Sequence, residues 1–439
     1  MGRVRWQCLA PIGWPRIGQT LGWCSASERK TSAHLSADHP SCCQATATMS
    51  ILDTPPAPHY FKPEHEQFRA MLRDWVAREI TPYVNEWDEA ETFPRELYRK
   101  ASEIGLLGMG YPEEYGGTPI DIFYRLIAAE ELARPGCGGV NASLNSHTIG
   151  LPPVLAHGSA ELKALIIPPV LRGEKIAALA VTEPSGGSDV AALKTTAVRD
   201  GDHYVVNGEK VFITSGMRAD FITVAVRTDP ASKGPHGISA LLIPGDTPGL
   251  TRTKLDKMGW WASDTAHLRF DHCRVPVANL IGEEHRGFRI FMANFNSERL
   301  GMAAGAIGHA QTCFDEALDW ARQRVTFGQP LSERQVIRHK LMDMVRKIDV
   351  ARCLVYDLSL ALQQERGDPN QLVARICMAK VEATQCMQFC ADTAVQILGG
   401  MGFMRGTRSE RIYREVKVMM IGGGSEEIMK DLAARQLGI

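Results

Sequence analysis

The chain has 439 residues, enough for two or three domains, and 44% hydrophobic residues can supply a sizeable core. A formal net charge of −1 excludes the basic field that binds nucleic acid or an anionic membrane. No apolar run reaches the ~18 residues that a bilayer crossing needs. The 11 cysteines form no C-x-x-C, disulfide or zinc pattern, so we expect no metal, and reduced thiols in a cytoplasmic location.

The first 48 residues differ in composition from the rest. They contain almost no acidic residues and no apolar periodicity, and Pro11 and Pro15 interrupt any helix. An Arg- and Ser-containing, acid-poor segment is typical of a mitochondrial transit peptide, which would place the protein in the mitochondrial matrix. Translation starting at Met49 explains the segment equally well. We predict that residues 1–57 are a disordered or mis-assigned extension.

Helical periodicity begins after residue 58. Apolar side chains recur every three or four residues from Phe68 to Ile80, before Pro82 ends the run. Similar patterns predict helices over 95–107, 123–132, 140–151 and 160–171. Residues 58–175 are therefore predicted to form a helical N-terminal domain.

From Ile176 the apolar period changes to two, which is typical of strands. Asn207-Gly208 separates residues 203–206 from 210–213 and predicts a hairpin. Further strands are expected at 221–227 and 237–243, and residues 268–270 with 274–276 would form one short last strand. Residues 176–284 would form a small β-domain.

Helical periodicity returns at Gly287 and continues to the end. Long helices are predicted over 300–321, 341–362 and 371–398, and a last one begins near Ser425. Residues 285–439 would then form a four-helix bundle. The predicted fold class is α+β, with a helical N-terminal domain, a central β-domain and a C-terminal bundle. The charged run 405–414 is expected to be a solvated face or helix end.

A Gly/Ser-rich stretch, AVTEPSGGSD (180–189), follows the first predicted strand. Pro184 ends strand pairing, while Gly186 and Gly187 let the backbone N–H groups approach a ligand. Thr182 and Ser188 add hydroxyl groups. This combination suits a flat, polar-edged ring or a phosphate-bearing ligand, although an ordinary turn uses the same residue types.

Two common enzyme motifs are absent from the sequence. No G-x-G-x-x-G opens a βαβ unit, which argues against a nicotinamide-binding Rossmann domain. No G-x-S-x-G nucleophile elbow occurs either.

The T-E-P-x-x-G-S-D run, followed by KVFITSG (210–216), resembles the flavin-binding part of acyl-CoA dehydrogenases. Helix, β, helix is also that family's domain order, and the resemblance covers about residues 58–439. It implies FAD, with the isoalloxazine lying against the β-domain. Its flavin-contacting residues would be Val181, Thr182, Gly187, Ser188, Phe212, Thr214 and Ser215.

RVTFGQPL (324–331) and QILGG (396–400) resemble the parts that reach the FAD of a neighbouring subunit. Arg324 would supply charge for the diphosphate, and Phe327 would pack on the nucleotide. The resemblance adds these cofactor-binding residues: Arg324, Phe327, Gln335, Gln396, Gly399, Gly400, Ser425 and Glu427. A site shared between subunits implies a homotetramer. A helix-capping glycine pair and a surface arginine are the alternative interpretation.

The reaction of this family needs a carboxylate base. Many members carry it just before the C-terminal helix, where this chain has IGGGSEE (421–427), with Gly423 at the aligned position. A subset resembling isovaleryl-CoA and long-chain acyl-CoA dehydrogenases instead places it in an E-R dipeptide, here Glu298 in NSERL. Partial burial would raise the pKa of Glu298. A solvated Glu298 paired with Arg299 or Arg289 is the alternative.

The resemblance also implies a substrate site in which the Gly423 N–H holds the thioester carbonyl. Its residues would be Ser188, Phe295, Asn296, Arg299, Gly422 and Gly423. The implied reaction is α,β-dehydrogenation of an acyl-CoA thioester to the trans-2-enoyl-CoA in fatty or branched-chain acyl catabolism. Glu298 would take the α-proton, flavin N5 the hydride, and electron-transfer flavoprotein the electrons. An acyl-CoA oxidase using O2 and a non-catalytic acyl-CoA-binding relative remain alternatives.

Overall fold

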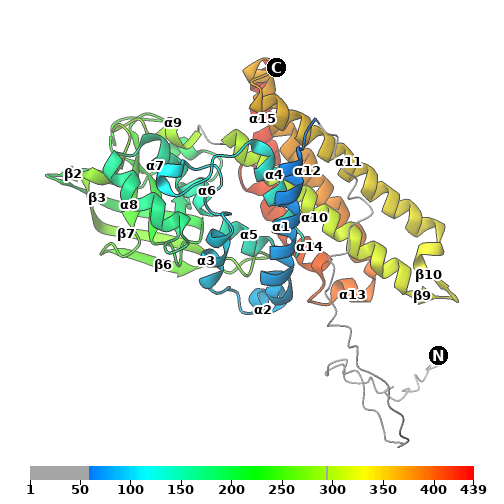
Figure 1. Cartoon of the computed structure of the whole chain (residues 1–439). Helices are drawn as coiled ribbons and strands as arrows, with labels where there is room; N and C mark the ends of the chain where they lie inside the picture. Colours follow the sequence, from blue (N-terminus) through cyan, green and yellow to red (C-terminus); the bar gives the residue numbers. More distant parts are fainter. Residues whose placement is uncertain (1–58, 293–294) are drawn as a thin grey trace, which may run out of the picture. The chain divides into compact units, whose positions relative to one another are not determined.

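The computed structural model describes residues 59–292 and 295–439. The predicted N-terminal extension, residues 1–57, lies outside this described part. In chain order the described residues form a helical region, a β-sheet region and a second helical region (Figure 1). The predicted α+β class and its three-part organisation are therefore confirmed.

The first region contains eight α-helices. They are α1 Pro63–Glu79, α2 Val84–Glu89, α3 Glu96–Glu103, α4 Ile122–Ala133, α5 Gly138–Leu144, α6 His147–Gly150, α7 Pro152–His157 and α8 Ala160–Leu171. The single helix expected over 140–151 is divided into α5 and α6. At this break the Asn145 side-chain amide donates to the carbonyl of Asn141, an alternative to regular helical pairing.

The sheet has eight strands. They are β1 Ala177–Ala180, β2 Thr196–Asp200, β3 His203–Thr214, β4 Phe221–Arg227, β5 Ile238–Pro244, β6 Leu250–Lys254, β7 Thr265–Pro276 and β8 Leu280–Ile281. The strand order is β6-β7-β3-β2-β4-β5-β8, and β1 pairs in parallel with β4. One face packs against α7 and α8, and β5 is buried almost throughout. The sheet therefore supplies a rigid support for the turn that leaves β1.

The prediction of a hairpin turn at Asn207-Gly208 is wrong. Strand β3 runs through both residues, and its register against β7 shifts between Val206 and Gly208. Gly208 has φ +142°, and a Cβ there would lie 2.7 Å from the Thr195 Cα. Asn207 keeps a negative φ, whereas a two-residue hairpin turn of type I′ needs positive φ at both positions. The glycine therefore serves a bulge where Thr195, the residue before β2, approaches closely.

The C-terminal region contains three helices of 29 or 30 residues and several shorter ones. The helices are α9 Gly287–Met292, α10 Phe295–Gln323, α11 Gln335–Gln363, α12 Pro369–Leu398, α13 Gly400–Phe403, α14 Arg408–Ile421 and α15 Glu426–Leu437. A hairpin of β9 (Val325–Thr326) and β10 (Gln329–Pro330) joins α10 to α11. Apolar residues of α10, α11, α12 and α14 share one core.

Helix α14 was not predicted. Residues 405–414 contain its first residue, Arg408, in agreement with the expected helix end, but the expectation of a solvated face is wrong for the centre of the run. Arg411 is only 1% exposed, and its guanidinium donates to the carbonyl of Gly136 at 3.2 Å. The charge lies inside because backbone carbonyls and the Asn85 side-chain oxygen accept its hydrogen bonds, while the Asp88 carboxylate 3.4 Å away balances it. A local charge run does not report such distant partners.

The two helical regions are joined through a common core. Phe123 and Leu126 of α4 belong to the same buried cluster as Leu300 and Ile307 of α10. The shared core therefore holds the start of α10 between the N-terminal helices and the rest of the C-terminal region.

None of the helices in the described parts of the chain is both long and apolar enough to cross a membrane.

Candidate active site

The turn that follows β1, residues 182–189, is called the T-E-P turn below and is built around a buried ion pair. Glu183 is 5% exposed, and one of its carboxylate oxygens lies 2.8 Å from the Lys210 ammonium on β3. The backbone N–H groups of Lys194 and Thr195 donate to the same carboxylate at 2.6 and 2.9 Å. Lys210 also donates to the carbonyl of Val181 at 2.9 Å. One carboxylate and one ammonium thus fold the whole turn back onto β3.

This arrangement brings the two predicted flavin segments together. The Val211 N–H donates to the Thr182 carbonyl at 2.9 Å, so the turn and β3 are hydrogen-bonded neighbours. Phe212 is 69% exposed with φ +63°, whereas Thr182 and Thr214 are half-buried. Val181 is half-buried, and Gly187 and Ser188 are exposed in the turn. An exposed aromatic ring beside hydroxyl and backbone donors fits a planar, polar-edged heterocycle.

Ser215 is placed differently from the other predicted flavin residues. It is fully buried, and its hydroxyl lies 3.5 Å from the carbonyl of Ser143, to which it donates. Its N–H donates to the carbonyl of Asp264 at 2.8 Å. The Ser215 side chain therefore ties the end of β3 to the helical region.

Glu298 lies in the first turn of α10 and lines a cavity of about 270 Å³. Most of the cavity wall is apolar or neutral. The lining residues are Gly110, Tyr111, Arg125, Thr148, Ile149, Pro152, Pro153, Leu155, Leu179, Ile290, Phe291, Ser297 and Glu298. They come from the N-terminal helices, β1 and the α9–α10 segment, so all three regions contribute.

The surroundings of Glu298 favour its protonated form. Burial raises the pKa of Glu298 to about 7, although the neighbouring Arg299 opposes this rise. Arg299 is itself buried and donates to the Asn296 side-chain oxygen at 3.3 Å. The predicted substrate residue Phe295 opens α10, but its side chain lies outside the described part of the chain. A carboxyl group with this pKa can accept or release a proton near neutral pH.

The Gly-rich loop between α14 and α15 lies against the same helix. Gly423 is exposed with φ +66°, and an ideal Cβ there would lie 2.7 Å from the Met302 sulfur. Met302 follows Glu298 by one helical turn, so the two side chains share a face of α10. Gly422 caps the end of α14, and the Ser425 hydroxyl caps the start of α15. The structure thus brings Gly423 close to the part of α10 that carries Glu298.

Arg324 and Phe327, which are predicted to bind the FAD of a neighbouring subunit, lie far from this loop in the same chain, whereas Ser425 and Glu427 directly follow Gly423. Helix α10 has 29 residues and is roughly 43 Å long at 1.5 Å per residue. Arg324 and Phe327 follow its far end, and Figure 1 draws their hairpin away from the β-domain. All but Ser425, which is half-buried, are exposed: Arg324, Phe327, Gln335, Gln396, Gly399, Gly400 and Glu427. The hairpin that carries Arg324 and Phe327 therefore lies away from the T-E-P turn of its own chain.

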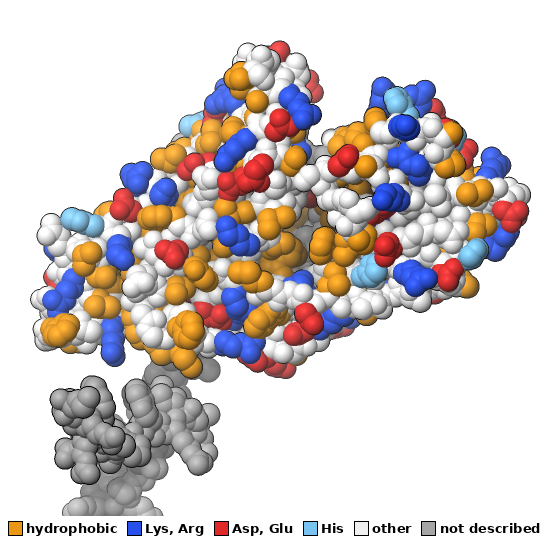
Figure 2. Space-filling view, turned by 180° about the vertical axis from the view of Figure 1, so that it is seen from behind, with side chains coloured by type: hydrophobic (Ala, Val, Ile, Leu, Met, Phe, Trp, Pro, Cys, Tyr) orange, Lys and Arg blue, Asp and Glu red, His pale blue; other side chains and the backbone are white. Residues whose placement is uncertain are grey.

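Seen from behind, the described residues surround a hollow between the lobe of the β-sheet and the projecting C-terminal helices (Figure 2). Apolar side chains border it, with acidic and basic groups at its edges (Figure 2). This face can admit a ligand that has both a charged and an apolar portion.

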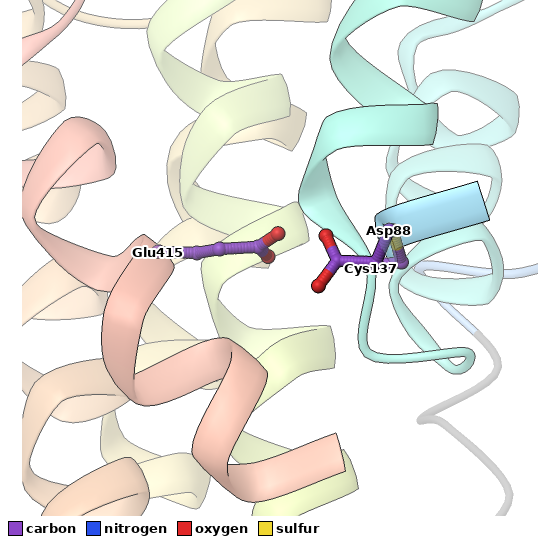
Figure 3. A group of neighbouring side chains, drawn as sticks. All are labelled: Asp88, Cys137 and Glu415. Carbon is purple, nitrogen blue, oxygen red and sulfur yellow. The ribbon is translucent and has the colours of Figure 1, made fainter. Parts of the chain in front are cut away.

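A second acidic group lies between α14 and the N-terminal helices. Glu415 and Asp88 point toward one another, with Cys137 beside them (Figure 3), and their ligand atoms lie within 4.8 Å. Arg411 and Arg414 contact Asp88 at 3.4 and 3.0 Å. Burial raises the pKa of Glu415 to about 8, so it is neutral near pH 7. Two guanidinium groups and a neutral acid favour a structural junction over a metal site.

Sequence reasoning missed four residues that shape the site: Glu183, Lys210, Met302 and Lys380. Lys210 and Lys380 are 0% exposed. The available signal was a charged residue inside an apolar run, as in the stretch around Lys380 on α12. Met302 carries no such signal, since a methionine on a helix is ordinary core composition.

Comparisons with known proteins agree with this geometry. Family models for the N-terminal, middle and C-terminal domains of acyl-CoA dehydrogenases match residues 62–174, 178–273 and 285–438. Human mitochondrial short-chain specific acyl-CoA dehydrogenase is 38% identical over 85% of this chain and 90% of its own length. The probable acyl-CoA dehydrogenase YngJ of Bacillus subtilis is 37% identical over 85% and 98%.

Solved structures give the same result. A putative acyl-CoA dehydrogenase from Mycobacterium smegmatis is 45% identical with a TM-score of 0.83, covering 87% of this chain and 99% of that one. Butyryl-CoA dehydrogenase from Megasphaera elsdenii is 32% identical with a TM-score of 0.81, covering 86% and 99%. Glutaryl-CoA dehydrogenase from M. smegmatis, solved in complex with FADH2, is 26% identical with a TM-score of 0.81, covering 87% and 96%.

The fold and the turn on its sheet define a flavoprotein oxidoreductase of three domains that acts on CH–CH groups. The chain belongs to the acyl-CoA dehydrogenase family.

Proposed function

We propose that this protein is an FAD-dependent dehydrogenase that converts an acyl-CoA thioester to its trans-2-enoyl-CoA, with Glu298 as the α-proton base. The observation that carries the proposal is the position of Glu298. It faces a cavity, has a pKa near 7, and lies one turn from the methionine that touches Gly423. The E-R position of the isovaleryl-CoA and long-chain subset thus coincides here with a chemically suitable carboxylate.

Two groups of the chain would act on the acyl-CoA. A base is most effective when its pKa is close to the working pH, and the pKa of Glu298 is about 7. Removing the α-proton leaves negative charge on the thioester oxygen, which a backbone N–H can stabilise. Gly423 is exposed beside Met302 and offers such an N–H. FAD, when bound, would supply the acceptor for the β-hydrogen as a hydride.

The T-E-P turn and β3 would hold the flavin ring. Phe212 offers an exposed face, and Thr182, Thr214 and the Gly187-Ser188 backbone offer hydrogen bonds to a polar edge. Glu183 and Lys210 would keep this surface in shape without contacting the ring, because both are buried in the turn.

The dinucleotide end would be held by a second copy of the chain, which leads us to propose a homotetramer. Arg324 and Phe327 lie beyond α10, too far along that helix to reach the T-E-P turn of their own chain. Phe327 is 97% exposed and Phe403 is 90% exposed, and such large apolar surfaces favour coverage by another subunit. Gln335, Gln396 and the Gly399-Gly400 pair lie in the same exposed set.

Electron-transfer flavoprotein is the electron acceptor we propose. The structure reported for the electron transferring flavoprotein of Acidaminococcus fermentans contains a chain 34% identical to this one, with a TM-score of 0.81. The relatives compared above are named dehydrogenases, which favours this acceptor over the O2 of an oxidase. Glu298 in its cavity argues against a non-catalytic relative, although position 423 lacks a carboxylate.

Anaerobic mixing of the purified yellow protein with a panel of straight and branched acyl-CoAs tests the proposal. We expect at least one acyl-CoA to bleach the flavin, and electron-transfer flavoprotein to restore turnover. Flavin that no acyl-CoA reduces would contradict the proposal. Rapid peroxide formation in air would support the oxidase instead.

A further inference from the structure

The loop that carries Gly423 is fastened by a buried lysine on another helix. Lys380 of α12 is 0% exposed, and its ammonium donates to the carbonyl of Met420 at 3.1 Å and to that of Gly424 at 2.8 Å. These two carbonyls flank residues 421–423. One cation therefore bridges both ends of the Gly-rich turn.

Burying an ammonium is costly unless hydrogen bonds replace its water. Among the described residues, Lys380 has no carboxylate within ion-pair distance, and its ammonium donates to backbone carbonyls. Met420 lies in the last turn of α14, where unpaired carbonyls and the helix dipole favour a positive charge. Because a leucine or methionine would fill the same space without this cost, the cation must contribute something specific.

The turn itself needs fastening. Gly423 and Gly424 have φ of +66° and +109°, and Gly422 precedes them. Consecutive glycines lose more conformational freedom on ordering than any other residues. Without a bridge, the Gly423 N–H would sample many directions. Because Lys380 holds the carbonyls of both Met420 and Gly424, the N–H of Gly423 keeps one orientation relative to α10.

We propose that Lys380 is a positioning residue that aims the Gly423 N–H at the thioester carbonyl of the bound acyl-CoA. This inference rests on the proposed function, since it assigns a role within the same site. Lys380 does not touch the reacting atoms; it acts through the loop. The catalytic groups remain Glu298 and the Gly423 amide.

Charges around Lys380 make its effect dependent on pH. Burial lowers the pKa of Lys380 to about 8, Glu426 opposes this change, and Arg299 adds to it. As pH rises past 8 the ammonium loses its charge, and its bonds to the two carbonyls weaken.

The test uses Lys380→Met, which keeps length and volume but removes the donors, with Lys380→Arg as the conservative variant. Lys430→Met on α15 is the matched control, because it removes an exposed lysine near the same loop. Difference infrared spectra of a bound 2-enoyl-CoA with an isotope-labelled thioester carbonyl report directly on the Gly423 hydrogen bond. Flavin content and melting temperature confirm that each variant is folded.

We expect the carbonyl band of Lys380→Met to move toward that of free enoyl-CoA, while Lys430→Met matches the wild type. The rate of flavin bleaching should fall about tenfold, since a displaced oxyanion donor loses part of its effect, with enoyl-CoA affinity changed less. Lys380→Arg should keep part of the wild-type band position and part of the wild-type bleaching rate. An unshifted carbonyl band in folded Lys380→Met would overturn the inference.

If Lys380→Met does not fold, the wild type still supplies the test. Its carbonyl band should shift as pH is raised through about 8, and this transition should move upward in Lys380→Arg. A band independent of pH would overturn the inference. A wild type that no acyl-CoA bleaches would contradict the proposed function, whereas normal bleaching without these band shifts contradicts the role of Lys380 alone.

Discussion

Gly423 and Met302 are in close contact: a Cβ built on Gly423 would lie 2.7 Å from the Met302 sulfur. Met302 stands one turn after Glu298 on α10, so the loop and the carboxylate approach the same part of the helix. The two positions at which the family resemblance places the base therefore lie near each other in space. Position 423 has no carboxylate here, which leaves Glu298 as the acid of this pair.

Replacing Glu298 by glutamine should remove the base while keeping shape and volume. We expect Glu298→Gln to bind flavin and acyl-CoA normally, and its rate of flavin bleaching to fall by about a hundredfold or more. Stopped-flow absorbance under anaerobic conditions measures this rate. Glu103→Gln is the control, because Glu103 is an exposed acid on α3. Near-normal bleaching in Glu298→Gln would show that the base lies elsewhere.

The pH dependence of bleaching should follow the protonation of Glu298. Burial raises the pKa of this group to about 7, and only the carboxylate can accept the α-proton. The bleaching rate in the enzyme–substrate mixture should therefore rise as pH increases through about 7. The same experiment on Glu298→Gln should show a residual rate without this rise. A wild-type rate that is constant from pH 6 to about 8 would contradict the assignment.

A carboxylate at position 423 should partly replace the lost base, provided that Met302 makes room. Glu298→Gln combined with Gly423→Glu should recover some bleaching, but φ +66° and the Met302 sulfur both oppose a side chain there. Adding Met302→Ala should increase the recovery. Met302→Ala with Glu298→Gln alone is the control. If the triple variant is no faster than that control, the two positions do not approach the same α-carbon.

The flavin assignment predicts that two hydroxyl groups matter. Thr182→Val and Thr214→Val together should weaken FAD binding or shift the flavin reduction potential, because hydrogen bonds to the ring stabilise its reduced form. Fluorescence titration of the flavin and a reductive titration measure the two effects. Thr251→Val is the control within the same chain, because Thr251 is exposed on β6 and lies outside all the predicted FAD-binding segments. Unchanged affinity and potential in the double variant would remove these threonines from the site.

The junction of Glu415 and Asp88 predicts a pH-dependent stability. The pKa of Glu415 is about 8 in the folded protein, against an ordinary value of 4.5. Between pH 4.5 and 8 the folded state therefore keeps a proton on this carboxyl group, whereas the unfolded chain does not. The contribution of Glu415 to the free energy of unfolding is therefore complete below pH 4.5. Above this pH it falls by up to about 1.4 kcal/mol per pH unit, and it is lost once the pH has risen through 8. Glu415→Gln should remove this dependence. Denaturant unfolding at several pH values measures it, and parallel pH profiles for both proteins would contradict the prediction.

Much of the organisation was readable from the sequence because it depends on neighbouring residues. Helical and strand periods located the three regions, and the T-E-P and E-R motifs pointed to the flavin turn and to Glu298. Periodicity is a local property, since it records which face of an element is buried. The Asn-Gly turn signal failed at residues 207 and 208, where the close approach of Thr195, and not a turn, requires the glycine.

The tertiary structure alone decided the contacts between distant segments. Lys380 holds the carbonyl of Gly424, Gly423 touches Met302, and Glu415 faces Asp88, although each pair is separated by many residues. The pKa of Glu298 likewise depends on burial by three regions, because desolvation is set by everything packed around a charge. A sequence names the groups that can carry charge, and only the folded chain determines which water molecules they lose and which partners replace them.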